Sequence, residues 1–253
     1  MKILITNDDG IKAEGISRLT AALSAVSDVF VFAPDSQRSA CGHGITVTVP
    51  IEVTEYNSLP DATAAWTVSG TPADCVKLGL RILKNQGICI DYVFSGINHG
   101  SNLGTDTLYS GTVSGAIEGV INGIPSFAVS VNARDPVHFE ASCEMALTAL
   151  KTAAGKLDGG TVLNINLPHV PASEVKGIRV TRLGAREYDE DFKVRSMGKG
   201  SVSYIYSGNP VVYSGLPGDI DVIAVQDGYA SITPLHYDLT NYQLVEKVKS
   251  WGL

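Results

Sequence analysis

The chain has 253 residues, of which 44% are hydrophobic and 18% charged, and its formal net charge is −7. This is the composition of a globular protein with material for a large core, and its negative charge argues against a protein that coats nucleic acid. The first residues lack the length and flanks of a signal peptide, and no apolar run is long enough to cross a bilayer. We therefore expect a cytoplasmic protein that binds neither a membrane nor a nucleic-acid polymer.

Strand and helix signals alternate through the first two-thirds of the chain. Short apolar, β-branched runs predict strands at residues 3–6, 28–33, 91–94, 126–131 and 161–165. Helical spacing of apolar residues predicts helices at residues 13–25, 72–83, 111–122 and 139–154. Residues 45–56 alternate residue by residue, which predicts a β-ribbon paired with residues 64–68. Strands that alternate with helices predict an α/β fold, in which a parallel sheet is covered by helices on both faces.

The pattern changes after Pro168. Strands are predicted at residues 178–183 and 228–235, and a closing helix at 238–250. Residues 187–206 are too polar for a core, so we expect a solvated hairpin or arm. The arm nevertheless carries four aromatic residues, and the closing helix has an apolar face that needs a partner. Because a lone hairpin is marginally stable in water, we expect a homo-oligomer.

Asp8 and Asp9 follow the first predicted strand directly, in the run KILITNDDGI. Two adjacent carboxylates repel each other unless a positive charge lies between them. One interpretation is that they cap the helix that starts a few residues later. A single aspartate is enough for a cap, so we favour the other interpretation, in which both bind a hard divalent cation through oxygen.

Residues 95–112, SGINHGSNLGTDTLYSGT, form a predicted loop of eighteen residues that runs into a helix. Its glycines allow backbone N–H groups to approach a ligand, and the helix offers unpaired donors at its N-terminus. With the hydroxyl groups of Ser110 and Thr112, this segment suits a phosphate. The alternative is an ordinary glycine-rich surface loop. A dinucleotide site is disfavoured because the two aspartates occupy the turn where a pyrophosphate would bind.

Four motifs follow one another along nearly the whole chain: ILITNDDG, GTPADCVKLG, SGINHGSNLGTDTLYSGTVSGAIEG and ITPL. Together they resemble the SurE (stationary-phase survival protein) family of nucleotidases. The resemblance implies a Rossmann-like catalytic core, here residues 1–170, with a C-terminal part, residues 171–253, that carries a β-hairpin arm and the closing helix. It implies homodimers or homotetramers with exchanged C-terminal elements. It also implies a metal-dependent phosphatase for nucleoside 5′- and 3′-monophosphates, with short polyphosphate as a further substrate of some members.

Residue by residue, the resemblance implies a role for each matching position. One Mg²⁺ or Mn²⁺ ion per subunit would be bound by Asp8, Asp9, Ser39 and Asn98. The substrate phosphate would be bound by Asn102, Ser110, Gly111 and Thr112. Asp8 and Asn98 are the expected catalytic residues. We expect the cation to activate a water molecule for attack on phosphorus. Direct attack by Asp8 is the alternative, and a nucleotide-binding regulatory protein without turnover is the competing hypothesis.

Overall fold

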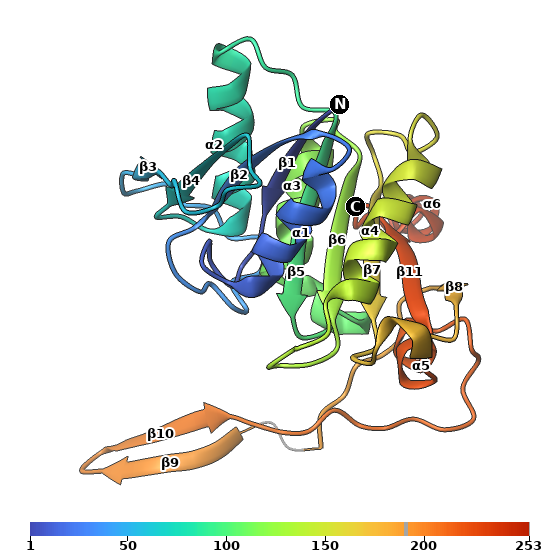
Figure 1. Ribbon diagram of the computed structural model, residues 1–253. Coiled ribbons are helices and arrows are strands. Elements are labelled where there is room, and N and C mark those ends of the chain that lie inside the picture. Colours follow the sequence, from blue (N-terminus) through green and yellow to red (C-terminus); the bar gives the residue numbers. More distant parts are fainter. Residues whose placement is uncertain (190–191, 253) are drawn as a thin grey trace.

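A computed structural model describes residues 1–189 and 192–252 (Figure 1). Within these residues one sheet has nine strands, in the spatial order β3-β4-β2-β1-β5-β6-β7-β11-β8. The strands are β1 (Lys2–Thr6), β2 (Asp28–Pro34), β3 (Val53–Glu55), β4 (Ala64–Val68), β5 (Tyr92–His99), β6 (Ser126–Val131), β7 (Val162–Leu167), β8 (Ile178–Val180) and β11 (Ala230–Leu235). Every pairing from β4 through β7 is parallel. The expected α/β fold with a mostly parallel sheet is confirmed.

Helices cover both faces of the sheet (Figure 1). Helices α1 (Glu14–Ser24) and α4 (Glu140–Ala153) pack on one face, and α2 (Pro72–Asn85) and α3 (Gly111–Ile121) pack on the other. Helix α2 begins as expected, because the Thr71 hydroxyl accepts a hydrogen bond from the Asp74 N–H.

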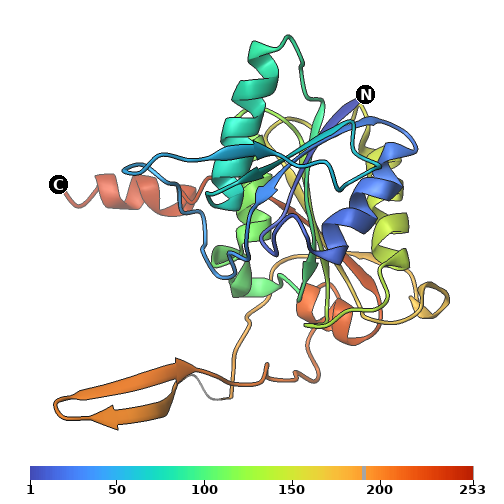
Figure 2. The ribbon, with the colours of Figure 1, turned by 60° about the vertical axis from the view of Figure 1, so that its left-hand side comes forward.

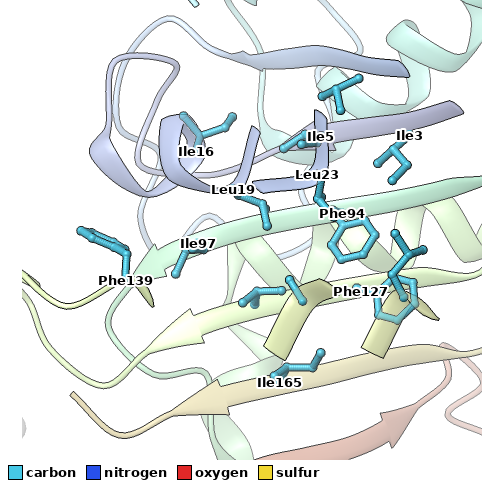
Figure 3. Close-up of a cluster of buried hydrophobic side chains, with 14 of the residues drawn as sticks. Ile3, Ile5, Ile16, Leu19, Leu23, Phe94, Ile97, Phe127, Phe139 and Ile165 are labelled. Carbon is cyan, nitrogen blue, oxygen red and sulfur yellow. The ribbon is translucent and has the colours of Figure 1, made fainter. Parts of the chain in front are cut away.

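The core is built from strands that are apolar on both sides. In β1, Ile3 and Ile5 belong to the cluster under α1, whereas Leu4 belongs to the cluster under α2, since successive side chains of a strand point to opposite faces. Figure 3 shows the first cluster, in which the stacked rings of Phe94 and Phe127 lie on neighbouring strands with their centroids 4.4 Å apart. Burial on both faces holds the ends of β1 and β5 in fixed positions.

Residues after 170 contribute to the same sheet. Strand β11 pairs antiparallel with β7, and β8 pairs parallel with β11, so within the described part of the chain β8 joins the sheet through a strand that follows it by about fifty residues. The short helix α5 (Asp221–Gln226) packs beneath β11.

Two C-terminal elements project from this body. The arm consists of the antiparallel strands β9 (Phe192–Gly198) and β10 (Ser201–Tyr206), in which every residue is exposed. Helix α6 (Tyr242–Lys249) has no buried residue, and in Figure 2 it extends away from the sheet near the C-terminus. The polar hairpin expected at residues 187–206 is therefore present, although Glu190 and Asp191 lie outside the described residues.

The structure differs from the predictions in the extent of two segments and in two elements that were not predicted. The β-ribbon expected over residues 45–56 is reduced to β3, which pairs with β4 as expected. The loop expected at 95–112 is shorter, because β5 continues to His99 and a 3₁₀ helix, η1, occupies Gly104–Leu108. Helix α5 and a short 3₁₀ turn, η2 (Ala172–Glu174), were not predicted. Among the described residues, no helix has the length and apolar character needed to cross a membrane.

Candidate active site

The order of the strands reverses beside β1. The chain places β2 and β4 on one side of β1 and then returns to place β5 on the other. Open parallel sheets bind ligands at such a switch point, outside the carboxyl ends of the strands. Asp8 and Asp9 follow the end of β1, and Asn98 lies near the end of β5. The topology therefore brings the first and third sequence motifs to one edge of the sheet.

A cavity of about 820 Å³ opens at this edge, and we call it the site cavity. Five of the predicted site residues line it: Asp8, Ser39, Asn98, Asn102 and Ser110. Three predicted residues are not part of the lining: Asp9, Gly111 and Thr112. Thr112 and Gly111 lie against Asp8 and shape the position of its carboxylate, whereas Asp9 is bound to the backbone N–H of His99 on β5.

Asp8 is a buried carboxylate, only 5% exposed. Its Oδ1 accepts a hydrogen bond of 2.5 Å from the Thr112 hydroxyl. The pKa of the Asp8 carboxyl is raised to about 6, chiefly by burial and to a smaller extent by the charge of Asp9, while the hydrogen bonds from Thr112 act in the opposite direction. Loss of water, more than repulsion by Asp9, is thus the reason that an ionised Asp8 needs a positive charge nearby.

Asp9 is held against β5. Its Oδ2 accepts a hydrogen bond of 3.0 Å from the backbone N–H of His99, and its Oδ1 lies 3.4 Å from Nε2 of Gln37. Neither aspartate caps α1, because the N-cap of that helix is Ala13, which makes no side-chain capping bond. The capping interpretation is not realised at the helix for which it was considered, and Asp8 lies instead against the first turn of α3.

Asn98 and Asn102 present amide groups to the site cavity. The Asn98 Nδ2 donates to the carbonyl of Gly100 at 2.7 Å, which leaves the side-chain oxygen available to accept or coordinate. The Asn102 Nδ2 donates to Oγ of Ser130 at 2.8 Å, and Asn102 is 6% exposed. Both side chains are thus oriented by fixed partners within the protein.

The start of α3 separates the roles of two predicted hydroxyl groups. Ser110 is the N-cap, and its Oγ accepts from the N–H of Val113 at 2.9 Å, so its own hydrogen remains free to donate to a ligand. Thr112 gives its hydroxyl hydrogen to Asp8. The N–H groups of the first helical turn have no acceptor within the helix, and they favour an anion at this position.

Two buried asparagines that sequence reasoning missed hold the loop after β5. Asn166 makes a pair of bonds with Asn102: its Oδ1 accepts from the backbone N–H at 2.7 Å, and its Nδ2 donates to the carbonyl at 3.1 Å. Asn164 donates to the same carbonyl at 2.8 Å. Both side chains are fully buried. Two polar residues on one face of an otherwise apolar strand were the available signal.

Replacing these asparagines separately tests their importance for the loop. We expect Asn166→Ala to lower the free energy of unfolding by roughly 2–3 kcal/mol, because the buried N–H of Asn102 loses its acceptor. Asn164→Ala removes the same number of atoms, but the Asn102 carbonyl keeps Asn166, so about 1 kcal/mol is expected. Urea denaturation followed by circular dichroism measures both values. Equal losses in the two variants would contradict the assignment.

A second group outside the predictions fixes the loop that carries Ser39. Glu118 on α3 is 2% exposed, and its two carboxylate oxygens lie 3.0 Å from Nε2 of His43 and 3.0 Å from Nζ of Lys77. Burial would raise the pKa of Glu118, but the bonds to His43 and Lys77 outweigh it and the pKa is lowered. The ionised Glu118 therefore holds the loop of His43 against α3.

The donor atoms at this edge fit a hard divalent cation. In residues 1–189 and 192–252 no three His, Cys, Asp or Glu side chains are grouped for metal binding. Two carboxylates and the neutral oxygens of Asn98 and Ser39 are what the site offers. Such a set, completed by water, is typical of Mg²⁺ or Mn²⁺ and not of a zinc site. A cation would also supply the positive charge that the buried Asp8 lacks.

Comparison with known protein families finds one whose profile covers most of the chain. The sequence profile of the family described as "Survival protein SurE" matches residues 3–190. The chain belongs to the SurE family. The resemblance noted from the motifs is thereby confirmed.

Relatives of the SurE family match over nearly the whole chain. A protein of Pelotomaculum thermopropionicum named "5'-nucleotidase SurE" is 48% identical over 98% of this chain and 94% of its own length. A protein of the same name from Syntrophomonas wolfei is 47% identical over the same shares. The crystal structure of the SurE protein from Aquifex aeolicus superimposes with a TM-score of 0.87 at 39% identity, covering 100% of both chains. Fold and sequence therefore agree on the family.

Proposed function

We propose that this chain is a metal-dependent phosphomonoesterase that hydrolyses nucleoside 5′-monophosphates to a nucleoside and phosphate. The observation that carries the proposal is the position of Asp8: a buried carboxylate at the end of β1, in contact with the first turn of α3. A cation-binding group and an anion-binding group thus meet at one cavity, as a phosphate ester and its metal require. The names of the relatives support the choice of nucleotide.

Each group of the site has a part in this reaction. Asp8, Asp9, Ser39 and Asn98 would hold one Mg²⁺ or Mn²⁺ ion, which supplies Lewis-acid stabilisation of charge on the phosphoryl oxygens. Ser110 donates its free hydroxyl hydrogen to the phosphate, and the N–H groups at the start of α3 stabilise charge on the equatorial oxygens. Thr112 keeps the Asp8 carboxylate oriented throughout.

Phosphate release tests the proposal directly. Purified protein is incubated with 5′-AMP, 3′-AMP or tripolyphosphate, each with Mn²⁺, with Mg²⁺ or with EDTA. We expect phosphate from 5′-AMP, loss of activity in EDTA and recovery on addition of Mn²⁺. The other two substrates define how far the activity extends. Tight binding of 5′-AMP without release of phosphate under any metal condition would favour the competing hypothesis, a regulatory nucleotide-binding protein.

Two variants separate metal binding from substrate binding. Asn98→Ala withdraws a neutral oxygen ligand, and we expect the Mn²⁺ concentration for half-maximal rate to rise about tenfold, as loss of about 1.4 kcal/mol produces. Ser110→Ala removes a donor to a charged acceptor, worth roughly 1.5–3 kcal/mol, and should raise KM for the nucleotide. Metal titrations and substrate titrations of both variants measure this. Ser110→Thr keeps the hydroxyl and is the control. An unchanged metal requirement in Asn98→Ala would remove that residue from the ligand set.

The C-terminal part of the chain supports a further proposal, that the protein assembles as a homodimer or homotetramer. The exposed arm carries Phe192, Tyr204 and Tyr206, which are each more than half exposed, and α6 exposes Tyr242 in the same way. These surfaces project from the body and suit contact with a second copy (Figure 2). The arm offers the simpler surface to remove.

Shortening the arm should reduce the size of the assembly. Lys193 and Ile205 are register partners, so residues 194–204 can be replaced by an Asn-Gly turn that joins them. We expect light scattering at micromolar concentration to give a smaller species for the shortened chain than for the full chain. A full chain that is already monomeric, or a shortened chain of unchanged oligomeric mass, would contradict the role given to the arm.

A further inference from the structure

A second cavity, of about 950 Å³, adjoins the site cavity at the root of the arm. Six residues line both cavities: Gly100, Ser101, Asp106, Arg186, Tyr188 and Tyr206. The two cavities are therefore one continuous cleft that runs from Asp8 to the base of the hairpin. A phosphate bound at α3 would occupy only one end of this cleft, which leaves room for the rest of a substrate.

The wall of the cleft on the side of the arm is anchored to the site. The Tyr188 hydroxyl donates to Oδ2 of Asp106 at 2.6 Å, and Nε of Arg186 lies 3.7 Å from the same oxygen. The fully buried Asp221 accepts from the N–H of Gly104 at 2.7 Å and from the N–H of Gly184 at 2.9 Å. These bonds tie η1 to the segment that leads into the arm, so the root of the arm is a fixed wall.

Two tyrosines line the site cavity with their rings exposed. Tyr109 is 66% exposed and directly precedes Ser110, the residue proposed to donate to the phosphate. Tyr206 is 58% exposed and comes from the last position of β10. The ring of Tyr206 contacts that of Tyr188 in an edge arrangement, with centroids 6.0 Å apart. Aromatic rings at the wall of an otherwise polar cleft are suited to stacking with a flat heteroaromatic group.

We propose that Tyr109 and Tyr206 form the binding site for the base of the nucleotide. The cleft places them beside the phosphate position, and neither ring has a role in the hydrophobic core. Asp106 and Arg186 line both cavities, as Tyr206 does, and offer hydrogen-bonding groups to the sugar or the base. The arm thus serves substrate recognition as well as assembly. This inference rests on the proposed nucleotidase function.

Kinetics on two substrates test the base site. The variants are Tyr109→Ala, Tyr206→Ala, the conservative Tyr206→Phe, and Tyr204→Ala as a matched control on the same strand outside the cleft. Each is assayed with 5′-AMP and with glycerol 2-phosphate, which has no ring. We expect KM for 5′-AMP to rise five- to hundredfold in Tyr206→Ala and Tyr109→Ala, the range given by loss of one stacking contact. In the same two variants, the rise in KM for glycerol 2-phosphate should be at least fivefold smaller than the rise for 5′-AMP.

The controls and a binding measurement keep the inference separate from the proposed function. Tyr206→Phe should retain a KM for 5′-AMP near that of the parent. Tyr204→Ala, which removes a ring of the assembly surface outside the cleft, should leave the ratio of the KM values for the two substrates unchanged. Calorimetry with adenosine, which carries no phosphate, should show binding that Tyr206→Ala weakens. Adenosine binding without any phosphate release would overturn the nucleotidase but not the base site. If Tyr109→Ala and Tyr206→Ala raised KM equally for 5′-AMP and glycerol 2-phosphate, or raised it for neither, the proposed base site would be overturned.

Discussion

Asp8→Asn should abolish turnover and at the same time stabilise the metal-free protein. The amide keeps the size of the side chain and one acceptor for the Thr112 hydroxyl, but it removes a charged ligand from the cation. We expect turnover to fall by about a hundred- to a thousandfold, the size seen when an essential electrostatic group is removed from an active site. Release of phosphate from 5′-AMP at saturating Mn²⁺ measures it.

The stabilisation should depend on pH in a defined way. The pKa of Asp8 is raised from 3.8 to about 6, chiefly by burial, so the folded chain binds the Asp8 proton more tightly than the unfolded chain. Stability of the metal-free parent therefore falls as pH rises from about 4 to about 6, by up to roughly 3 kcal/mol. Asp8→Asn lacks this loss.

Denaturation with EDTA present compares the two proteins at pH 4 and pH 7.5. The advantage of Asp8→Asn should be near zero at pH 4 and largest at pH 7.5, and Mn²⁺ should raise the stability of the parent alone. Asp9→Asn is the control: Asp9 is half-buried, so its replacement should cost activity without the same gain in stability. If the difference in stability between the parent and Asp8→Asn did not change with pH, ionisation of Asp8 would not destabilise the folded chain.

Gly111→Ala should inactivate the protein while leaving it folded. Alanine normally stabilises a helix relative to glycine by up to about 1 kcal/mol. Here, however, a Cβ at position 111 would lie 2.8 Å from Cβ of Asp8 and 3.1 Å from Sγ of Cys41. Asp8 is buried and bound to Thr112, so it can yield only by moving its carboxylate. A displacement of about 1 Å in an active site costs on the order of a hundredfold in rate.

A second glycine of α3 provides the matched control. A Cβ at Gly119 would meet Oγ of Ser126 at 2.3 Å and Cβ of Val93 at 2.9 Å, contacts in the core and away from the cavity. Gly119→Ala should therefore lower the melting temperature and have little effect on activity at 25 °C. Gly111→Ala should lower activity at 25 °C and have little effect on the melting temperature. If Gly111→Ala turned over substrate at the parental rate, the close fit between α3 and Asp8 would not matter for catalysis.

The elements that sequence predicted well are those whose signal is local. Strands β1, β2 and β6 are short apolar runs that are buried on both faces, and α2 carries its own cap in Thr71 and Pro72. The sequence predicts a loop at the end of β5, because Ser95, Gly96 and Asn98 are small or polar. Pairing with β6 keeps this segment extended, and the local sequence of β5 contains no information about a strand that follows later in the chain.

The location of a predicted site residue could likewise be inferred from the sequence where it depends only on the residue's position at the end of a strand. Polar groups that follow a buried strand, such as Asp8 and Asp9, were predictable because strand ends meet at one edge of a parallel sheet. The different hydrogen bonds of the Ser110 and Thr112 hydroxyl groups could not be predicted, because they depend on which groups each hydroxyl meets after folding. The support of Asn102 by Asn166 joins residues 64 positions apart and has no counterpart in the sequence pattern.

The position of β11 has a consequence for the order in which the protein is made. Strand β8 leaves the ribosome about fifty residues before β11, the neighbour through which it joins the sheet. Until residues 230–235 emerge, β7 is the outermost paired strand, and its free edge of backbone N–H and C=O groups is a template for any other chain. A nascent chain therefore has this edge open while its arm is being synthesised, and unpaired strand edges make such intermediates prone to aggregate. When β11 pairs with β7 it covers this edge, and β8, which has only three residues, becomes the edge strand in its place.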